Sequence, residues 1–182
     1  MARAEEWIAA HREELIREVQ MIVRIPSVSR PDLAAAGEPF GPECRQALEH
    51  MLSRGEAFGF RTRNLDGYAG TISLGKDDPA IGIIGHLDVV PVGDGWVYPP
   101  FEGVYLPEWD VIIGRGADDN KGPTVAALFL MRMLRDLEIP LRHGIRLYCG
   151  TNEEIGMMDM AHLRQTGEKF PRFPWCRMPD SR

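Results

Sequence analysis

The stretch AIGIIGHLD, residues 80–88, joins an apolar run to two polar side chains that follow it. Its first six residues are all apolar or glycine, which is typical of a β-strand that is covered on both faces. His86 and Asp88 follow this apolar run at once. Because ligands of open α/β sheets bind beyond the carboxyl ends of the strands, the stretch predicts a buried strand that ends at a functional site.

The same arrangement of an apolar run before polar side chains occurs twice more. Residues 111–116 (VIIGRG) precede Asp118, Asp119 and Asn120, and residues 144–151 (GIRLYCGT) precede Glu153 and Glu154. We therefore predict three strands whose ends bring carboxylates and an imidazole into one crevice. Clustered carboxylates repel one another unless a cation lies among them, so the pattern favours a metal site.

Each motif also has an ordinary interpretation when it is taken alone. His86 and Asp88 could form a simple turn, Asp118 to Asn120 could cap a helix, and Glu153-Glu154 could be a solvated loop. The metal hypothesis is preferred because these ordinary interpretations require three coincidences. A phosphate-binding loop in GRGADDNKGPT is rejected, because Lys121 is followed by glycine and two aspartates would face the phosphates.

The rest of the chain alternates between helical and extended patterns. Apolar residues at helical spacing predict helices over 3–24 and over the segment from Cys44 to Leu52, separated by a Pro/Gly-rich loop over 31–43. Further predicted elements are a strand over 68–75 and helices over 123–138 and 157–166. This order indicates an α/β domain with a mainly buried sheet flanked by helices.

Composition excludes several classes of protein. The 182 residues suffice for one domain, and a net charge of −6 without basic runs argues against a nucleic-acid partner. We find neither a signal peptide nor an apolar run long enough to span a membrane. The three cysteines form no CxxC pair, which favours free thiols and a cytoplasmic location.

The spacing within the motifs predicts different roles for neighbouring acidic residues. If the segments are extended, His86 and Asp88 share a face, so the aspartate can orient the imidazole. Neighbouring side chains such as Glu153 and Glu154 would point to opposite faces. One glutamate can then bind a metal while the other acts as a general base, as metal-assisted hydrolysis requires.

The motifs GHLDVVPVGDGW, PPF, GRGADDNKGPT and TNEEIG, in this order, resemble the dinuclear zinc metallopeptidases that include aminoacylases, carboxypeptidases and dipeptidases. The DNKGPT ending is most similar to the PepV/carnosinase-like dipeptidase branch, and RIPSVS (residues 24–29) also fits. The resemblance covers essentially the whole chain. It implies a zinc-peptidase-like catalytic domain with a mixed sheet.

The resemblance also implies roles for individual residues. His86 and Asp180 would bind one metal ion, Glu154 would bind a second, and Asp119 would bridge the two. Asp88 would orient His86, and Glu153 would be the general base. The resemblance further implies a cis peptide bond between Asp119 and Asn120. The cofactors would be two divalent ions, Zn²⁺ by default, although oxygen-rich sites also accept Mn²⁺ or Co²⁺.

Relatives of this kind continue for a few hundred residues, so residues 1–182 are expected to be the N-terminal part of the catalytic domain. The missing part would hold a second metal-binding histidine and a lid or dimerisation domain, through which a homodimer could form. The function implied is a dipeptidase acting on small peptides. The alternatives are an N-acyl amino acid amidohydrolase or carboxypeptidase, and a catalytically silent metal- or partner-binding fragment.

Overall fold

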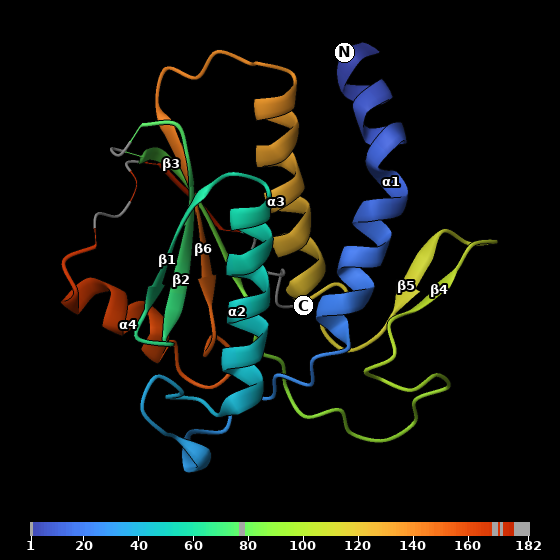
Figure 1. Cartoon of the computed structure of the whole chain (residues 1–182). Coiled ribbons are helices and arrows are strands. Elements are labelled where there is room, and N and C mark those ends of the chain that lie inside the picture. Colours follow the sequence, from blue (N-terminus) through green and yellow to red (C-terminus); the bar gives the residue numbers. More distant parts are fainter. Residues whose placement is uncertain (1, 77–78, 169–170, 172, 177–182) are drawn as a thin grey trace.

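A five-stranded sheet forms the centre of the computed structural model, which describes residues 2–76, 79–168, 171 and 173–176 (Figure 1). Within these residues the strand order is β1-β2-β6-β3-β7. The strands are β1 (Arg61–Leu65), β2 (Ala69–Leu74), β3 (Pro79–His86), β6 (Gly144–Gly150) and β7 (Phe173–Cys176). β1, β2 and β6 are antiparallel neighbours, whereas β3 runs parallel to both β6 and β7. The expected mixed sheet is confirmed.

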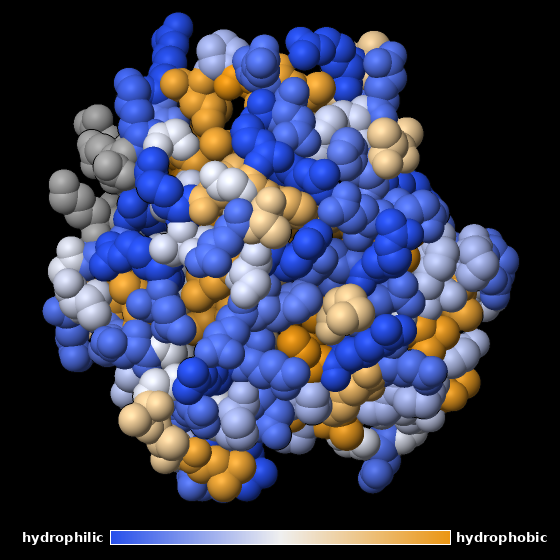
Figure 2. All heavy atoms as spheres, viewed as in Figure 1, coloured by the Kyte–Doolittle hydropathy of each residue, from blue (hydrophilic) through white to orange (hydrophobic). Residues whose placement is uncertain are grey.

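Helices cover both faces of this sheet. α2 (Pro42–Ala57) and α3 (Lys121–Asp136) pack on one face, and α1 (Ala2–Val23) packs against them from outside (Figure 1). α4 (Met158–Gln165) lies on the other face, where Leu163 packs with Leu65, Ala69 and Tyr148. All four predicted helices are therefore present. The face seen in Figure 2 is largely hydrophilic, with smaller apolar areas between the charged side chains.

Glycines allow both sides of β3 to be approached closely. A methyl group at Gly85 would lie 2.3 Å from the Thr124 hydroxyl, so α3 can contact the strand only because that position has no side chain. A methyl group at Gly82 would lie 2.1 Å from Pro171. These positions explain why a glycine-containing apolar run, rather than a run of large residues, forms the strand that leads to His86.

The predicted short strand over residues 111–116 is present over 111–113, but its implied place beside the other strands that end at the site is wrong. β5 (Val111–Ile113) is short and pairs with β4 (Val104–Leu106) in a separate two-stranded sheet beside α1 (Figure 1). The chain turns after Ile113, and Gly116 has a positive φ of 85°. A local apolar pattern indicates a strand, but it cannot specify the sheet that the strand joins. The aspartates that follow are thus carried by a loop and not by the central sheet.

Three strands were not anticipated, namely β4 of the hairpin, β1 and β7. β1 reads RTRNL, and only its last residue is buried, so it lacks the apolar alternation that predicts a strand. β1 forms because Arg61–Leu65 pair with Ala69–Ser73 across a tight turn. β7 lies beside β3 in parallel, a long-range contact that local sequence does not signal.

Candidate metal centre

Three segments that are far apart in the sequence meet at the carboxyl ends of β3 and β6. His86 is the last residue of β3, Asp119 lies in the loop before α3, and Glu154 lies in the turn that follows β6. One ligand atom from each of these residues lies within 4.8 Å of the others. His86 Nε2 and Asp119 Oδ1 are 3.1 Å apart. The structure therefore brings together three of the four predicted metal ligands.

The imidazole of His86 is buried and held in one orientation. Its Nδ1 lies 3.0 Å from the backbone carbonyl oxygen of Asp88, to which an Nδ1–H group donates a hydrogen bond. This bond directs Nε2 towards Asp119 and Glu154. Burial alone would lower the pKa of His86. The hydrogen bond and charge of Asp88, with the charge of Glu153, outweigh burial and raise that pKa to about 9.

Asp88 has a second contact that the sequence did not indicate. Its carboxylate is completely buried, with Oδ1 3.5 Å from His86 Nδ1. The same carboxylate accepts hydrogen bonds from the backbone N–H groups of Glu153 and Glu154, each at 3.1 Å. Asp88 therefore links the end of β3 to the turn that carries both glutamates.

Glu153 and Glu154 lie in a turn and not in an extended segment. The extended conformation assumed for these two residues is therefore wrong. Glu154 belongs to the group of potential ligands, whereas Glu153 Oε2 lies 3.8 Å from His86 Nε2. Burial raises the pKa of Glu154, and the nearby charges of Asp119, Asp88 and Glu153 raise it further against the opposing effect of His86.

Asp119 reaches the site from the loop between β5 and α3. The peptide bond between Asp119 and Asn120 is cis, which confirms the expectation from the resemblance. Asn120 is buried, and its side-chain and backbone oxygens accept hydrogen bonds from the Thr124 hydroxyl in the first turn of α3. The remaining predicted ligand, Asp180, lies outside the described residues.

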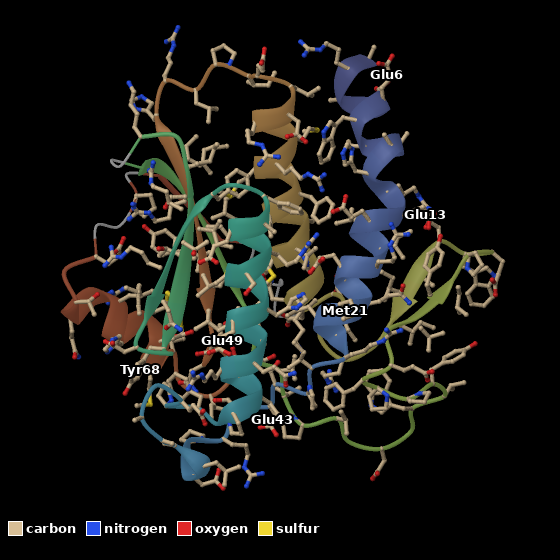
Figure 3. All side chains as sticks on the ribbon, in the orientation of Figure 1. Glu6, Glu13, Met21, Glu43, Glu49 and Tyr68 are labelled. Atoms are coloured by element: carbon tan, nitrogen blue, oxygen red, sulfur yellow. The ribbon has the colours of Figure 1, made fainter. Side chains whose placement is uncertain are left out.

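Other buried polar residues support the site and were missed in the sequence. The carboxylate of Asp159, near the start of α4, accepts hydrogen bonds from the backbone N–H groups of Thr151 at 2.9 Å and Asn152 at 3.0 Å. Thr151 in turn donates a hydrogen bond to the backbone oxygen of Tyr68. Tyr68, which is labelled in Figure 3, lies in the turn between β1 and β2. No local pattern singles out Asp159, because its partners lie in another segment.

A large cavity of about 1080 Å³ lies beside the site but does not contain it. Apolar residues of α1, β3, α3 and the β4–β5 hairpin line most of it. Asp118 and Asn120 contribute to its wall, whereas His86, Asp119 and Glu154 do not. The candidate centre is therefore defined by its side-chain chemistry and not by this cavity.

The donors of the site fit a divalent metal ion. Zinc bonds to imidazole nitrogen and carboxylate oxygen are about 2.0–2.2 Å long, so two ligands of one tetrahedral ion lie roughly 3.3 Å apart. The 3.1 Å between His86 and Asp119 agrees with that spacing. Two carboxylates around one imidazole suit zinc, and also manganese or cobalt. The centre can thus hold a cation that neutralises its clustered carboxylates.

An α/β sheet with imidazole and carboxylate side chains at its carboxyl edge is an arrangement that suits metal-assisted hydrolysis. Residues 82–174, just over half of the chain, match the model of peptidase family M20/M25/M40. The chain belongs to this family. The matched residues include every candidate site residue except Asp180.

Curated relatives are similar over most of this chain. One, from Bacillus subtilis (strain 168), is named "Putative dipeptidase YtjP" and is 43% identical over 151 residues, which are 83% of this chain and 32% of that protein. A relative from Staphylococcus saprophyticus with a similar dipeptidase name is 39% identical over 161 residues, 88% of this chain and 34% of its own. The chain thus spans about a third of the length of these relatives.

Solved structures share the fold. Human carnosine dipeptidase 1 superposes with a TM-score of 0.75 at 24% identity, and the dipeptidase Dug1p of Saccharomyces cerevisiae with 0.77 at 18%. Each match covers 91% of this chain and 37% of the other. The YXEP protein of Bacillus subtilis, described as a dinuclear metal-binding peptidase, matches with a TM-score of 0.57 at 17% identity, over 87% of this chain and 40% of that one.

Among the described residues, no helix is both long and apolar enough to cross a membrane.

Proposed function

We propose that the protein is a metal-dependent dipeptidase that hydrolyses the peptide bond of small peptides. The observation that carries this proposal is the meeting of His86, Asp119 and Glu154 within 4.8 Å, with Glu153 beside them. Membership of the peptidase family and the dipeptidase names of its relatives support the choice of substrate class.

The proposed centre holds two divalent ions, with Zn²⁺ as the first choice. His86, Asp119, Glu154 and Asp180 would hold these ions, with Asp119 as the ligand assigned to both. The role of Asp180 as a metal ligand rests on the sequence alone, whereas the roles of His86, Asp119 and Glu154 are supported by their proximity. When bound, such ions lower the pKa of a water molecule and polarise the scissile carbonyl group.

Glu153 is the proposed general base. Its carboxylate lies close to the ligand group without belonging to it, which leaves it free to accept a proton from the attacking water. Glu153 then delivers that proton to the leaving amine. Asp88 holds the backbone of Glu153 and Glu154 through two hydrogen bonds, so it keeps base and ligand at a constant distance from His86.

The metal centre is tested by elemental analysis of the purified chain after dialysis against Zn²⁺ or Mn²⁺. We expect at least about one tightly held ion per chain, and its loss in His86→Ala, because a two-ion site loses a ligand that no neighbour replaces. Glu13→Ala is the control, since Glu13 is an exposed residue of α1 remote from the site (Figure 3). Equal metal content in His86→Ala and the parent chain would contradict the assignment.

The base is tested in the full-length protein, by turnover of a panel of dipeptides with metal content measured in parallel. We expect Glu153→Ala to keep its metal and to lose about 10²–10⁴-fold in kcat, the usual contribution of general acid–base catalysis. Near-normal turnover would refute the role of Glu153. Faster hydrolysis of N-acyl amino acids would favour the amidohydrolase alternative. A chain that binds metal and hydrolyses neither class would be a silent module.

A further inference from the structure

The segment of residues 25–29, which follows α1, contacts all three loops of the candidate centre. The first contact is with the loop that carries His86 and Asp88. The Ser27 hydroxyl donates a hydrogen bond to the backbone oxygen of Leu87 at 2.5 Å, and the Val89 N–H donates one to the backbone oxygen of Ser27 at 3.0 Å. Val28 and Val89 also form an isolated parallel bridge. Both sides of Asp88 are thereby bonded to the 25–29 segment.

The second contact is with the turn that carries the two glutamates. Asn152 directly precedes Glu153, and its side-chain amide donates a hydrogen bond to the Ser29 hydroxyl at 2.8 Å. The side-chain oxygen of Asn152 accepts a hydrogen bond from the Met158 N–H at 3.2 Å. Both Asn152 and Ser29 are buried, so water competes little for these bonds.

The third contact is with the first residue of α3, directly after the loop that carries Asp119. The side-chain amine of Lys121, two residues beyond Asp119, donates a hydrogen bond to the backbone oxygen of Ile25 at 2.5 Å. Lys121 is completely buried, an unusual situation for a lysine. The amine of Lys121 thus contacts the 25–29 segment and not solvent.

We propose that the 25–29 segment is a positioning element that holds the three ligand-bearing loops in register for metal binding. None of its residues is a candidate ligand, yet its polar contacts join segments 60, 96 and 123 residues away in the sequence. Metal ligands must be held within about 0.5 Å of their working geometry by the residues around them. This inference rests on the proposed metal centre.

The competing explanation is that these contacts only satisfy buried polar groups and stabilise the fold. Ser29→Ala and Ser73→Ala separate the two explanations, because both serines are buried and both accept one side-chain hydrogen bond. Asn152 donates to Ser29 at 2.8 Å, and Arg146 donates to Ser73 at 3.0 Å. Ser73 lies in β2 and pairs with Arg146, four residues before the end of β6 at which His86 is paired.

The experiment titrates each variant of the chain with Co²⁺, whose visible absorption reports directly on its ligands, and measures urea unfolding of the metal-free protein. We expect both serine variants to lose similar stability. Of these two variants, Ser29→Ala alone should bind Co²⁺ more weakly than the parent chain. The expected loss of affinity is about tenfold, the lower end of the range for residues that orient metal ligands. Ser27→Ala, which removes the bond to Leu87, should weaken binding in the same way and decides the matter if Ser29→Ala does not fold.

Co²⁺ binding by Ser29→Ala equal to that of Ser73→Ala would overturn the positioning role. That result is distinct from failure of the proposed function. If the parent chain bound no Co²⁺, or if His86→Ala bound it as well as the parent, the metal centre itself would be wrong and the positioning role would fall with it.

Discussion

At the scale of single residues, the centre depends on side chains that do two things at once. The backbone oxygen of Asp88 accepts a hydrogen bond from His86, while the Asp88 carboxylate accepts hydrogen bonds from the backbone N–H groups of two glutamates.

Cys44 and Cys149 are buried free thiols, and burial raises the pKa of each to about 12. Such thiols are inert, and their free state agrees with the expectation from the sequence.

Gly85 is a residue whose lack of a side chain is needed. A methyl group there would meet the Thr124 hydroxyl at 2.3 Å and Asn120 Oδ1 at 2.9 Å, so Gly85→Ala must push α3 away from β3. We expect a loss of about 1–3 kcal/mol in the free energy of unfolding, measured in urea. Metal binding should weaken as well, because Asn120 adjoins Asp119.

A second substitution checks the cause of that loss. Thr124→Ala removes the closest contact, so the double variant Gly85→Ala/Thr124→Ala should be more stable than the sum of the single effects implies. Simple additivity would show that the crowding against Thr124 is not what destabilises Gly85→Ala.

At the scale of elements, ion pairs hold α1 against α2 and α3. Glu18 of α1 is buried and pairs with His50 at 2.5 Å and with Arg54 at 2.7 Å, both on α2. Glu14, one turn earlier, pairs with Arg54 and with Arg132 of α3. These contacts fix the end of α1, and so the start of the 25–29 segment that follows it.

Glu18→Ala is expected to destabilise the fold by about 1–3 kcal/mol in urea unfolding, because it leaves a charged arginine partly buried without one of its partners. The value is below that of a fully buried pair, since the side chain of Arg54 is 28% exposed. Glu49→Ala is the matched control on α2, where Glu49 pairs with Arg45 at the surface (Figure 3). Its loss should stay under about 0.5 kcal/mol. Equal losses would contradict a special role for Glu18.

At the scale of the whole molecule, the candidate centre couples metal binding to folding. Its ligands lie in three separate segments, and His86 and Asp119 alone are 33 residues apart. They converge only in the folded chain, so an ion binds the folded state in preference to the unfolded one.

Zn²⁺ or Co²⁺ should therefore raise the unfolding temperature, and a chelator should reverse the rise. At a free metal concentration of about 100 times Kd, the gain in the free energy of unfolding is about 2.7 kcal/mol. Thermal unfolding followed by circular dichroism measures it. Asp119→Asn should abolish most of the rise, because it removes the ligand assigned to both ions. A full metal-dependent rise in this variant would argue that the ion binds elsewhere.

The α/β class, the buried strand before His86, the helices and the acidic motifs could all be predicted from the sequence. They could be predicted because apolar periodicity and the spacing within a motif are local properties. The tertiary structure alone decided that residues 111–113 join a separate hairpin, and that Asp119 comes from a loop. It also revealed the second contact of Asp88, the support from Asp159 and the bonds to the 25–29 segment. These features depend on which distant segments pack together, and no local pattern encodes that.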